Sequence, residues 1–198
     1  MDTTPARSEL IVGGQKSGKS RRAQALARAW LAQSSGHRAV LVATARGDDE
    51  EMRERIKRHQ RDRLHDVPAV VTMEEPLELA RALHTHNRSD TLVVVDCVTL
   101  WLTNLLWPAH GAEEPVAGAP VALPDVAAAT AALLQAVAGA AGPVVLVSNE
   151  IGLGVVPMGR EVRAFVDALG LLNQQLAGAC ERVTLMASGL PLVLKGAA

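Results

Sequence analysis

The segment GGQKSGKS, residues 13 to 20, has residue types and spacing that can hold a phosphate group. Gly13, Gly18, Lys19 and Ser20 match the pattern G-x-x-x-x-G-K-[ST], after an apolar run and before a helical one. Glycines let backbone N–H groups surround a phosphate, and the helix that follows adds its positive dipole end. We expect Lys19 to contact the β- and γ-phosphates as a catalytic group, and the Ser20 hydroxyl to bind Mg²⁺. The expected phosphate loop, or P-loop, comprises Gly13, Gly14, Gln15, Lys16, Ser17, Gly18, Lys19 and Ser20.

A carboxylate at the end of another apolar run could serve the same metal. The run TLVVVD ends at Asp96. Ligands of open parallel sheets gather at the carboxyl ends of the strands, so Asp96 can meet the Mg²⁺ ion that Ser20 holds. An acid in this place could equally be only the polar residue that ends a strand. The expected metal ligands are therefore Ser20 and Asp96.

The segment EEMRERIKRHQRDR, residues 50 to 63, places six Arg and Lys side chains around His59. On a helix, Met52 and Ile56 lie on the same face as His59, which directs the imidazole toward the protein. A solvated charged face, or a half-buried histidine bonded to one carbonyl, would also fit this pattern. Phosphoryl transfer needs cations but no histidine nucleophile, so His59 suggests a second chemistry.

Composition limits the function classes. The chain has 198 residues, 48% of them hydrophobic, which fits one domain with a full core. Aromatic residues make up 2% and the pI is near 6.6, which disfavours nucleic acid as a partner. Cys97 and Cys180 form no CxxC pair, and we expect both to be reduced core residues of a cytoplasmic protein. The first ten residues lack a signal-peptide pattern, and Gly and Pro interrupt the apolar stretch 126–147, so no membrane span is expected.

The elements that must position these groups alternate between apolar strands and helices. Strands are expected at 9–14, 38–45, 69–74, 91–100, 143–148, 182–188 and 191–195, the last as an edge strand. Helices are expected at 19–33, 48–63, 76–86, 101–107, 125–140 and 160–179. This alternation predicts an α/β fold with a largely parallel sheet covered by helices on both faces. We expect a single domain over residues 1–198, with a tail at 1–8 and a Pro-rich surface loop at 108–124.

Several segments together resemble one enzyme family. In chain order they read IVGGQKSGKS, VLVATA, DDEEMRERIKRHQRDR, TMEE, VVVDCVTLWLTNLL, VVLVSNEIGLGVVP, FVDALGLLNQQLA and ASGLPLVLK. This order is similar to that of the bifunctional adenosylcobinamide kinase/adenosylcobinamide-phosphate guanylyltransferase family. P-loops occur in many families, but the combination of the His-containing basic helix with NEIGLGVVP and LLNQQLA is far more specific. The resemblance covers nearly the whole chain apart from the first eight residues and the Pro-rich loop.

The resemblance implies two reactions of cobalamin biosynthesis, on a RecA-like P-loop fold. A nucleoside triphosphate, ATP or GTP, phosphorylates the aminopropanol hydroxyl of adenosylcobinamide. GTP then transfers GMP to a histidine, and adenosylcobinamide phosphate takes the GMP to give adenosylcobinamide-GDP. The family's guanylylated histidine falls in the pattern R-I-x-x-H, which implies His59 as a catalytic residue. The cofactors and partners implied are GTP, ATP, Mg²⁺ and the corrinoid substrate, in a homo-oligomer such as a trimer.

Further nucleotide-binding positions are implied by the same resemblance. They are Ala43, Thr44, Ala45, Gln60, Arg61, Asp62, Arg63, Glu74 and Asp96. Val70 departs from the family, which often has an aromatic residue in this place. The segment NEIGLGVVP, residues 149–157, could either contact the corrinoid or only fix its loop. Two other functions remain open: a P-loop kinase of another small molecule without nucleotidyl transfer, and a nucleotide-dependent switch or binding protein.

Overall fold

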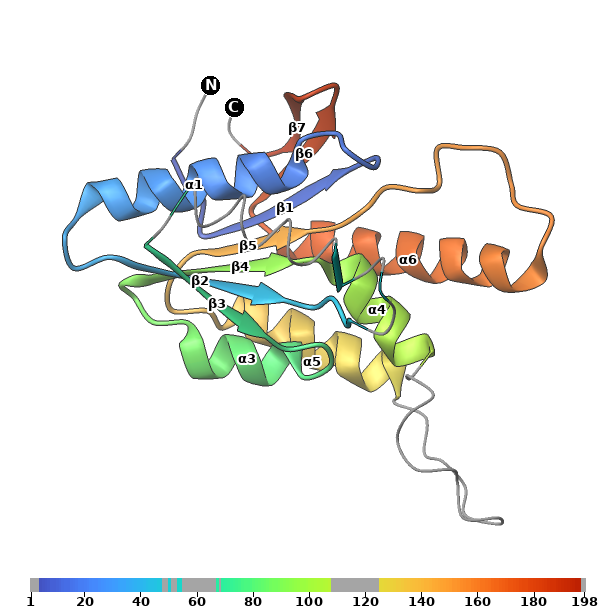
Figure 1. The fold of residues 1–198 in the computed structure, drawn as a ribbon, viewed down its shortest axis with the longest axis horizontal. Helices are drawn as coiled ribbons and strands as arrows, with labels where there is room; N and C mark the ends of the chain where they lie inside the picture. Colours follow the sequence, from blue (N-terminus) through green and yellow to red (C-terminus); the bar gives the residue numbers. More distant parts are fainter. Residues whose placement is uncertain are drawn as a thin grey trace, which may run out of the picture.

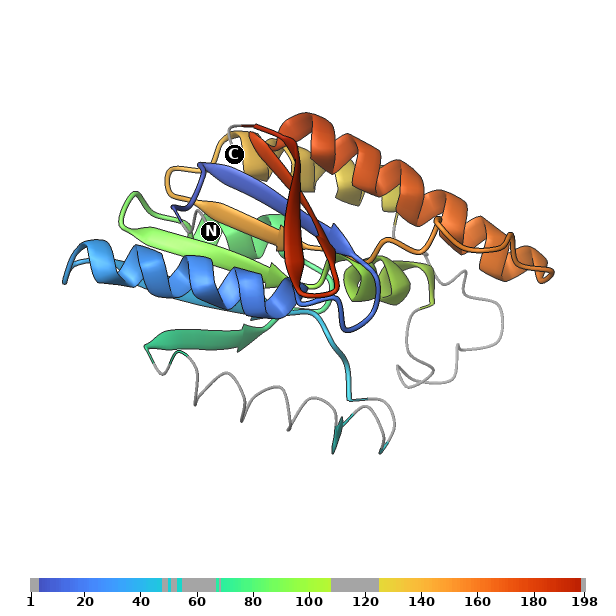
Figure 2. The ribbon, with the colours of Figure 1, turned by 90° about the horizontal axis from the view of Figure 1, so that it is seen from above.

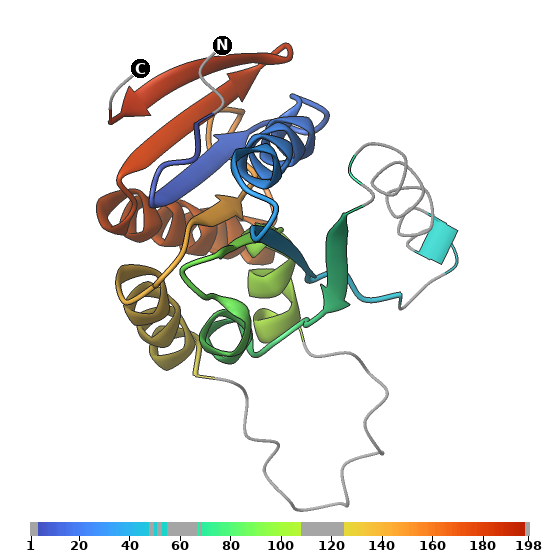
Figure 3. The same ribbon diagram turned by 90° about the vertical axis from the view of Figure 1, so that its left-hand side faces the viewer.

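The structure is a computed structural model, and it describes residues 4–47, 50, 53–54, 67, 69–107 and 125–196. The described strands form one seven-stranded sheet in the order β3-β2-β4-β5-β1-β6-β7 (Figures 1 and 3). The strands are β1 (Ser8–Gly13), β2 (Arg38–Ala43), β3 (Val70–Glu74), β4 (Thr91–Asp96), β5 (Val144–Val147), β6 (Arg182–Ala187) and β7 (Leu190–Lys195). The helices are α1 (Lys19–Gln33), α3 (Leu79–His86), α4 (Val98–Leu106), α5 (Val126–Ala138) and α6 (Arg160–Ala179).

Helices cover both faces of a largely parallel sheet. Neighbouring strands are parallel from β3 to β6, and β7 alone runs antiparallel, to β6. Helix α1 lies on one face, and α3, α4, α5 and α6 lie on the other (Figures 1 and 2). The expected α/β architecture is confirmed.

Strand residues alternate between two apolar layers because successive side chains point to opposite faces of a sheet. Leu10 belongs to the layer under α5 and α6, where it shares a cluster with Leu133 and Leu169. Ile11, the next residue of β1, belongs to the layer under α1, together with Leu26. The central strands are buried on both sides, which explains their near-continuous apolar sequences.

Most expected elements occur within three residues of the expected bounds, with two corrections. The strand expected at 91–100 ends at Asp96, and Val98 already begins α4. The hydroxyl of Thr44 binds both backbone groups of Cys97, and this local pairing replaces the ladder beyond Asp96. Ser8 belongs to β1 and not to the expected tail. The loop expected at 108–124 lies outside the described residues, as does most of the helix expected at 48–63.

The strand order brings the carboxyl ends of the central strands to one edge. Strand β5 lies between β1, which leads into the P-loop, and β4, which ends at Asp96. Asp96 pairs in register with Ala43 of β2 and with Val147 of β5. The segments that follow these strands therefore start side by side, which is the arrangement that forms ligand sites in open α/β sheets.

Candidate active site

The P-loop leaves β1 through a glycine that no other residue could replace without distortion. Gly13 has φ 154°, and a Cβ there would lie 2.5 Å from the carbonyl oxygen of Met186. Gly18 has φ 103° and caps the start of α1, as its left-handed conformation allows. The Ser17 hydroxyl is buried and has no hydrogen-bond partner within the described chain, so a phosphate oxygen could satisfy it. The loop thus has the backbone form expected of a phosphate cradle.

The Lys19 ammonium lies inside the P-loop. Its Nζ donates hydrogen bonds to the carbonyl oxygens of Gly13, at 2.9 Å, and Gly14, at 2.7 Å. Burial lowers the pKa of Lys19 from its ordinary value, and the neighbouring Cys97 and Asp96 offset part of this effect. The ammonium is therefore placed where the motif predicts a contact to the β- and γ-phosphates.

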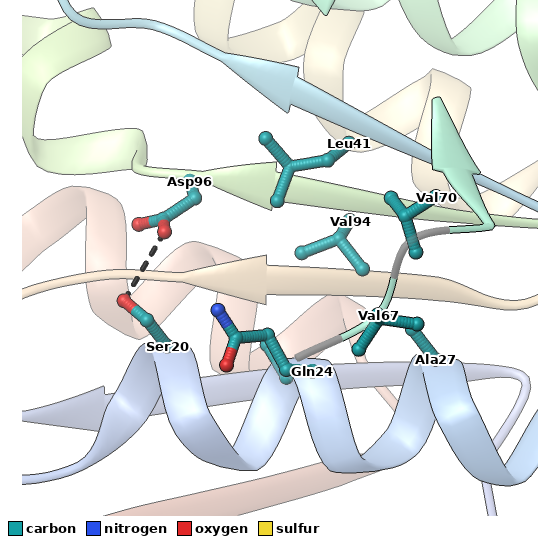
Figure 4. Close-up of a pocket in the computed structure, with 9 residues that line it drawn as sticks. Ser20, Gln24, Ala27, Leu41, Val67, Val70, Val94 and Asp96 are labelled. Atoms are coloured by element: carbon teal, nitrogen blue, oxygen red, sulfur yellow. Dashed lines mark hydrogen bonds between the residues drawn. The ribbon is translucent and has the colours of Figure 1, made fainter. Parts of the chain in front are cut away.

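Ser20 and Asp96 meet across the gap between α1 and β4. The Ser20 hydroxyl donates a hydrogen bond of 3.1 Å to Oδ2 of Asp96 (Figure 4). A hydroxyl and a carboxylate are the hard oxygen ligands that Mg²⁺ prefers. Among the described residues no group of three or more His, Cys, Asp and Glu side chains could hold a metal ion. A site with two protein ligands suits Mg²⁺, which keeps waters and takes further oxygens from substrate phosphates.

Thr44 fixes the backbone just beyond Asp96. Its side chain is fully buried, and its Oγ1 donates to the carbonyl of Cys97 at 2.7 Å and accepts from the Cys97 amide at 2.9 Å. The Thr44 carbonyl in turn accepts a 2.8 Å bond from Nδ2 of Asn104 in α4. Thr44 belongs to a stretch expected to bind nucleotide, and that role stays a prediction; its hydroxyl itself bonds to the protein. It positions the residue next to the carboxylate.

The other expected positions divide into those that meet at this edge and those that lie outside the described residues. Ala43 pairs in register with Glu74 of β3 on one side and with Asp96 on the other, and Ala45 follows it half-buried. His59 and Gln60, Arg61, Asp62 and Arg63 lie outside the described residues, so their expected roles stay predictions.

An apolar pocket opens beside the Ser20–Asp96 pair. Its polar end is formed by these two side chains and Gln24, and the other side chains that line it are apolar (Figure 4). The apolar residues are Ala23, Ala27, Leu41, Val67, Val70 and Val94. Val70 lines this pocket at the end away from Ser20 and Asp96 (Figure 4).

A hydrogen-bond network explains why the segments NEIGLGVVP and LLNQQLA occur together. Asn173 of α6 accepts a 2.7 Å bond from the Ser148 hydroxyl and donates a 3.0 Å bond to the carbonyl of Asn149. The Thr99 hydroxyl, in α4, accepts from the Asn149 amide at 2.7 Å. These polar groups fix the chain as it leaves β5, and no spacing pattern in the sequence indicates that they are connected.

A buried carboxylate ties the P-loop helix to the sheet, and sequence reasoning missed it. Glu9 of β1 is fully buried and accepts bonds of 2.8 Å from Arg22 Nε of α1 and from the Thr184 hydroxyl of β6. Arg182 lies 3.8 Å from its second oxygen. Such a carboxylate needs cationic and hydroxyl partners to offset its desolvation. It sets the position of α1 against β1.

The chain matches one family over nearly its whole length. Residues 9–194 match the family described as cobinamide kinase / cobinamide phosphate guanyltransferase. The chain belongs to this family. The expected resemblance is therefore confirmed, and with it the assignment as a kinase and guanyltransferase of adenosylcobalamin biosynthesis that uses nucleotides.

Curated relatives of the cobinamide kinase family align with nearly the whole chain. The bifunctional adenosylcobalamin biosynthesis protein CobP of Pseudomonas aeruginosa is 43% identical over 95% of this chain and 97% of its own. The CobU protein of the same description from Escherichia coli is 35% identical, over 94% of this chain and 98% of its own. That from Salmonella typhimurium is 34% identical, with the same coverage.

A solved structure supports the fold alone. The flagellar accessory protein FlaH from Methanocaldococcus jannaschii superposes with a TM-score of 0.52 at 14% identity, over 98% of this chain and 80% of that one. With the sheet order and the P-loop, this likeness confirms the expected RecA-like P-loop class. No helix within the described ranges is both long and apolar enough to span a bilayer.

Proposed function

We propose that this one nucleotide site serves two successive transfers: phosphorylation of adenosylcobinamide, then transfer of GMP from GTP through a covalent bond to His59. The observation that carries the proposal is the Ser20–Asp96 contact of 3.1 Å beside the buried Lys19, at the edge where β1, β4 and β5 end. The arrangement has the cationic and oxygen groups that phosphoryl transfer uses.

In the first reaction the aminopropanol hydroxyl attacks the γ-phosphorus and loses its proton to solvent, and the bond to the leaving nucleoside diphosphate breaks. The P-loop amides and Lys19 hold the β- and γ-phosphates and stabilise the charge that develops on them. Ser20 and Asp96 would hold Mg²⁺. When bound, that ion neutralises phosphate charge and orients the triphosphate.

In the second reaction a neutral imidazole nitrogen of His59 attacks the α-phosphorus of GTP, and pyrophosphate leaves. A phosphate oxygen of adenosylcobinamide phosphate then attacks the same phosphorus, which breaks the N–P bond and restores the imidazole. The arginines near His59 in the sequence would stabilise charge on the phosphoryl oxygens and favour the neutral, nucleophilic ring. The family pattern R-I-x-x-H supports His59 as this nucleophile.

Incubation with α-labelled GTP tests the second reaction. The label should remain on the protein through base and be lost in acid, as a phosphoramidate requires. His59→Asn keeps approximate size and hydrogen bonding but has no nucleophilic nitrogen, so it should form no adduct. His65→Asn, with the same substitution six residues along, is the matched control and should form the adduct normally.

Kinase turnover on the same preparations separates the two activities. His59→Asn should retain it to within about tenfold, or about 1.4 kcal/mol of barrier. Loss of both activities would show that His59 is structural, and an adduct that survives in His59→Asn but not in His65→Asn would move the nucleophile to His65. A homo-oligomer and a cytoplasmic location remain part of the proposal, and gel filtration with light scattering tests the former.

A further inference from the structure

The loop between β5 and α6, residues 149–159, presents an unusual apolar surface. From Ile151 to Gly159 it contains no charged residue. Val155 and Met158 are 96% and 95% exposed. The large apolar residues exposed along it are Ile151, Leu153, Val155, Val156 and Met158. Exposed apolar side chains gathered in one segment indicate a contact surface, whereas isolated ones do not.

Both ends of this loop are fixed. At its start, Asn149 is held by Thr99 and Asn173, and Glu150 accepts a 2.8 Å bond from the Gly152 amide. At its end, Nη1 of Arg163 donates to the carbonyls of Pro157, at 2.9 Å, and Met158, at 2.5 Å. A surface that the protein already orders loses little conformational freedom when a ligand binds it.

The start of the loop lies beside Lys19 of the P-loop. The Glu150 amide donates a 3.0 Å bond to the carbonyl of Gly13, the same oxygen that accepts a bond from Lys19 Nζ. From this point the loop and the first turns of α6 extend beyond the edge of the sheet at which the strands end (Figures 1 and 2). Any acceptor that reaches a γ-phosphate held by Lys19 must therefore lie next to the start of this loop.

We infer that the apolar loop 151–158 is the docking surface for the corrin macrocycle of the acceptor, an inference that rests on the proposed function. The acceptor hydroxyl sits on a short aminopropanol arm, so the macrocycle must lie within that arm's length of the transferred phosphate. A corrin ring is broad, with methyl groups and uncharged amides around its rim. An uncharged loop with valine, leucine and methionine side chains matches that chemistry. The charged phosphates would be bound separately, by the adjacent P-loop.

Equilibrium dialysis of adenosylcobinamide in the dark, followed by its visible absorbance, measures docking without chemistry. The test variant is Val155→Ser with Met158→Ser. The matched control is Leu171→Ser with Leu194→Ser, which removes two exposed apolar side chains from α6 and β7. The Kd for adenosylcobinamide should rise at least tenfold in the test variant, which corresponds to about 1.4 kcal/mol. It should stay within about twofold in the control.

Two further measurements decide between explanations. Binding of a fluorescent GTP analogue should be the same in both variants and the parent, because the P-loop is intact. Gel filtration with light scattering should give the same oligomeric state for all three. If the test variant dissociates into smaller species and loses cobinamide affinity with them, the loop is an interface between copies and the inference is overturned.

Failure of the inference and failure of the proposed function give different results. A parent chain that binds adenosylcobinamide, with an equal Kd in the Val155→Ser and Met158→Ser variant, overturns only the docking surface. A parent chain that binds no cobinamide and phosphorylates none overturns the proposed function, and the docking surface with it.

Discussion

Replacement of Thr44 by valine tests how the protein holds the backbone next to its expected metal ligand. Valine has nearly the same shape as threonine but no hydroxyl. The buried Cys97 amide then loses its 2.9 Å acceptor. The Cys97 carbonyl loses one bond but keeps the 3.2 Å bond from the Trp101 amide. One buried donor is thus left unsatisfied, which costs about 1–3 kcal/mol.

We therefore expect Thr44→Val to lower the free energy of unfolding by about 2 kcal/mol, measured by urea denaturation. Thr44→Ser keeps the hydroxyl and loses one methyl group, so its cost should be about 1 kcal/mol. Thr72→Val, on the exposed side of β3, is the control and should change stability by less than about 0.5 kcal/mol.

The two Thr44 variants should also differ in the Mg²⁺ concentration that they need for kinase activity. Because Cys97 follows Asp96 directly, a shift of its backbone should raise the Mg²⁺ concentration for half-maximal kinase activity in Thr44→Val and leave it nearly unchanged in Thr44→Ser. Direct Mn²⁺ binding in the presence of nucleotide, followed by electron paramagnetic resonance, gives a readout independent of turnover. Equal stability of Thr44→Val and Thr44→Ser would refute the reasoning, because the hydroxyl would then do nothing that a methyl group cannot.

Three further predictions concern Lys19, Asp96 and the thiols. Lys19→Ala should weaken triphosphate binding in a fluorescent-analogue titration and abolish kinase turnover, and normal turnover would remove Lys19 from the mechanism. Asp96→Asn should need more Mg²⁺ for half activity than the parent, whereas Asp90→Asn, just before the same strand, should not; identical curves would make Asp96 only a strand terminator. Burial raises the pKa of both Cys97 and Cys180 to about 11, so Ellman's reagent at pH 8 should react slowly with the native protein and count two thiols once it is unfolded. In the unfolded chain the thiols ionise near pH 9, but in the folded chain they stay neutral up to about pH 11, so the free energy of unfolding should fall as pH rises from about 9 toward 11. Fast labelling at pH 8 would contradict their burial.

Local sequence signals predicted the elements that are defined by apolar periodicity and by glycines at their ends. Lys19–Gln33 and Arg160–Ala179 occur as helices at the expected bounds, since apolar periodicity and flanking glycines define them without tertiary help. The predicted end of β4 was wrong because the segment CVTL, residues 97–100, is as apolar as the strand before it. What stops the strand is the Thr44 hydroxyl, 53 residues away in sequence.

The site shows the same division. The P-loop and Asp96 could be found because their spacing and their place after apolar runs reflect the chemistry directly. Glu9 could not, because a glutamate at the start of a strand ordinarily indicates an exposed edge. Its burial depends on Arg22 and Thr184, which only the folded sheet brings to it. Asn173 likewise acquires its role from a loop that precedes α6.

The ammonium of Lys19 donates two of its three N–H groups to carbonyls of its own loop, and this affects how it binds a nucleotide. A phosphate can accept the third N–H of the ammonium directly, but it must displace the carbonyl of Gly13 or Gly14 to accept more than one. Hydrogen bonds to charged groups contribute about 1.5–3 kcal/mol each, so the measured affinity reports only the surplus of the new contacts over the old. In the transition state, where phosphoryl charge increases at the same place, that surplus grows. The lysine should therefore matter more for turnover than for affinity.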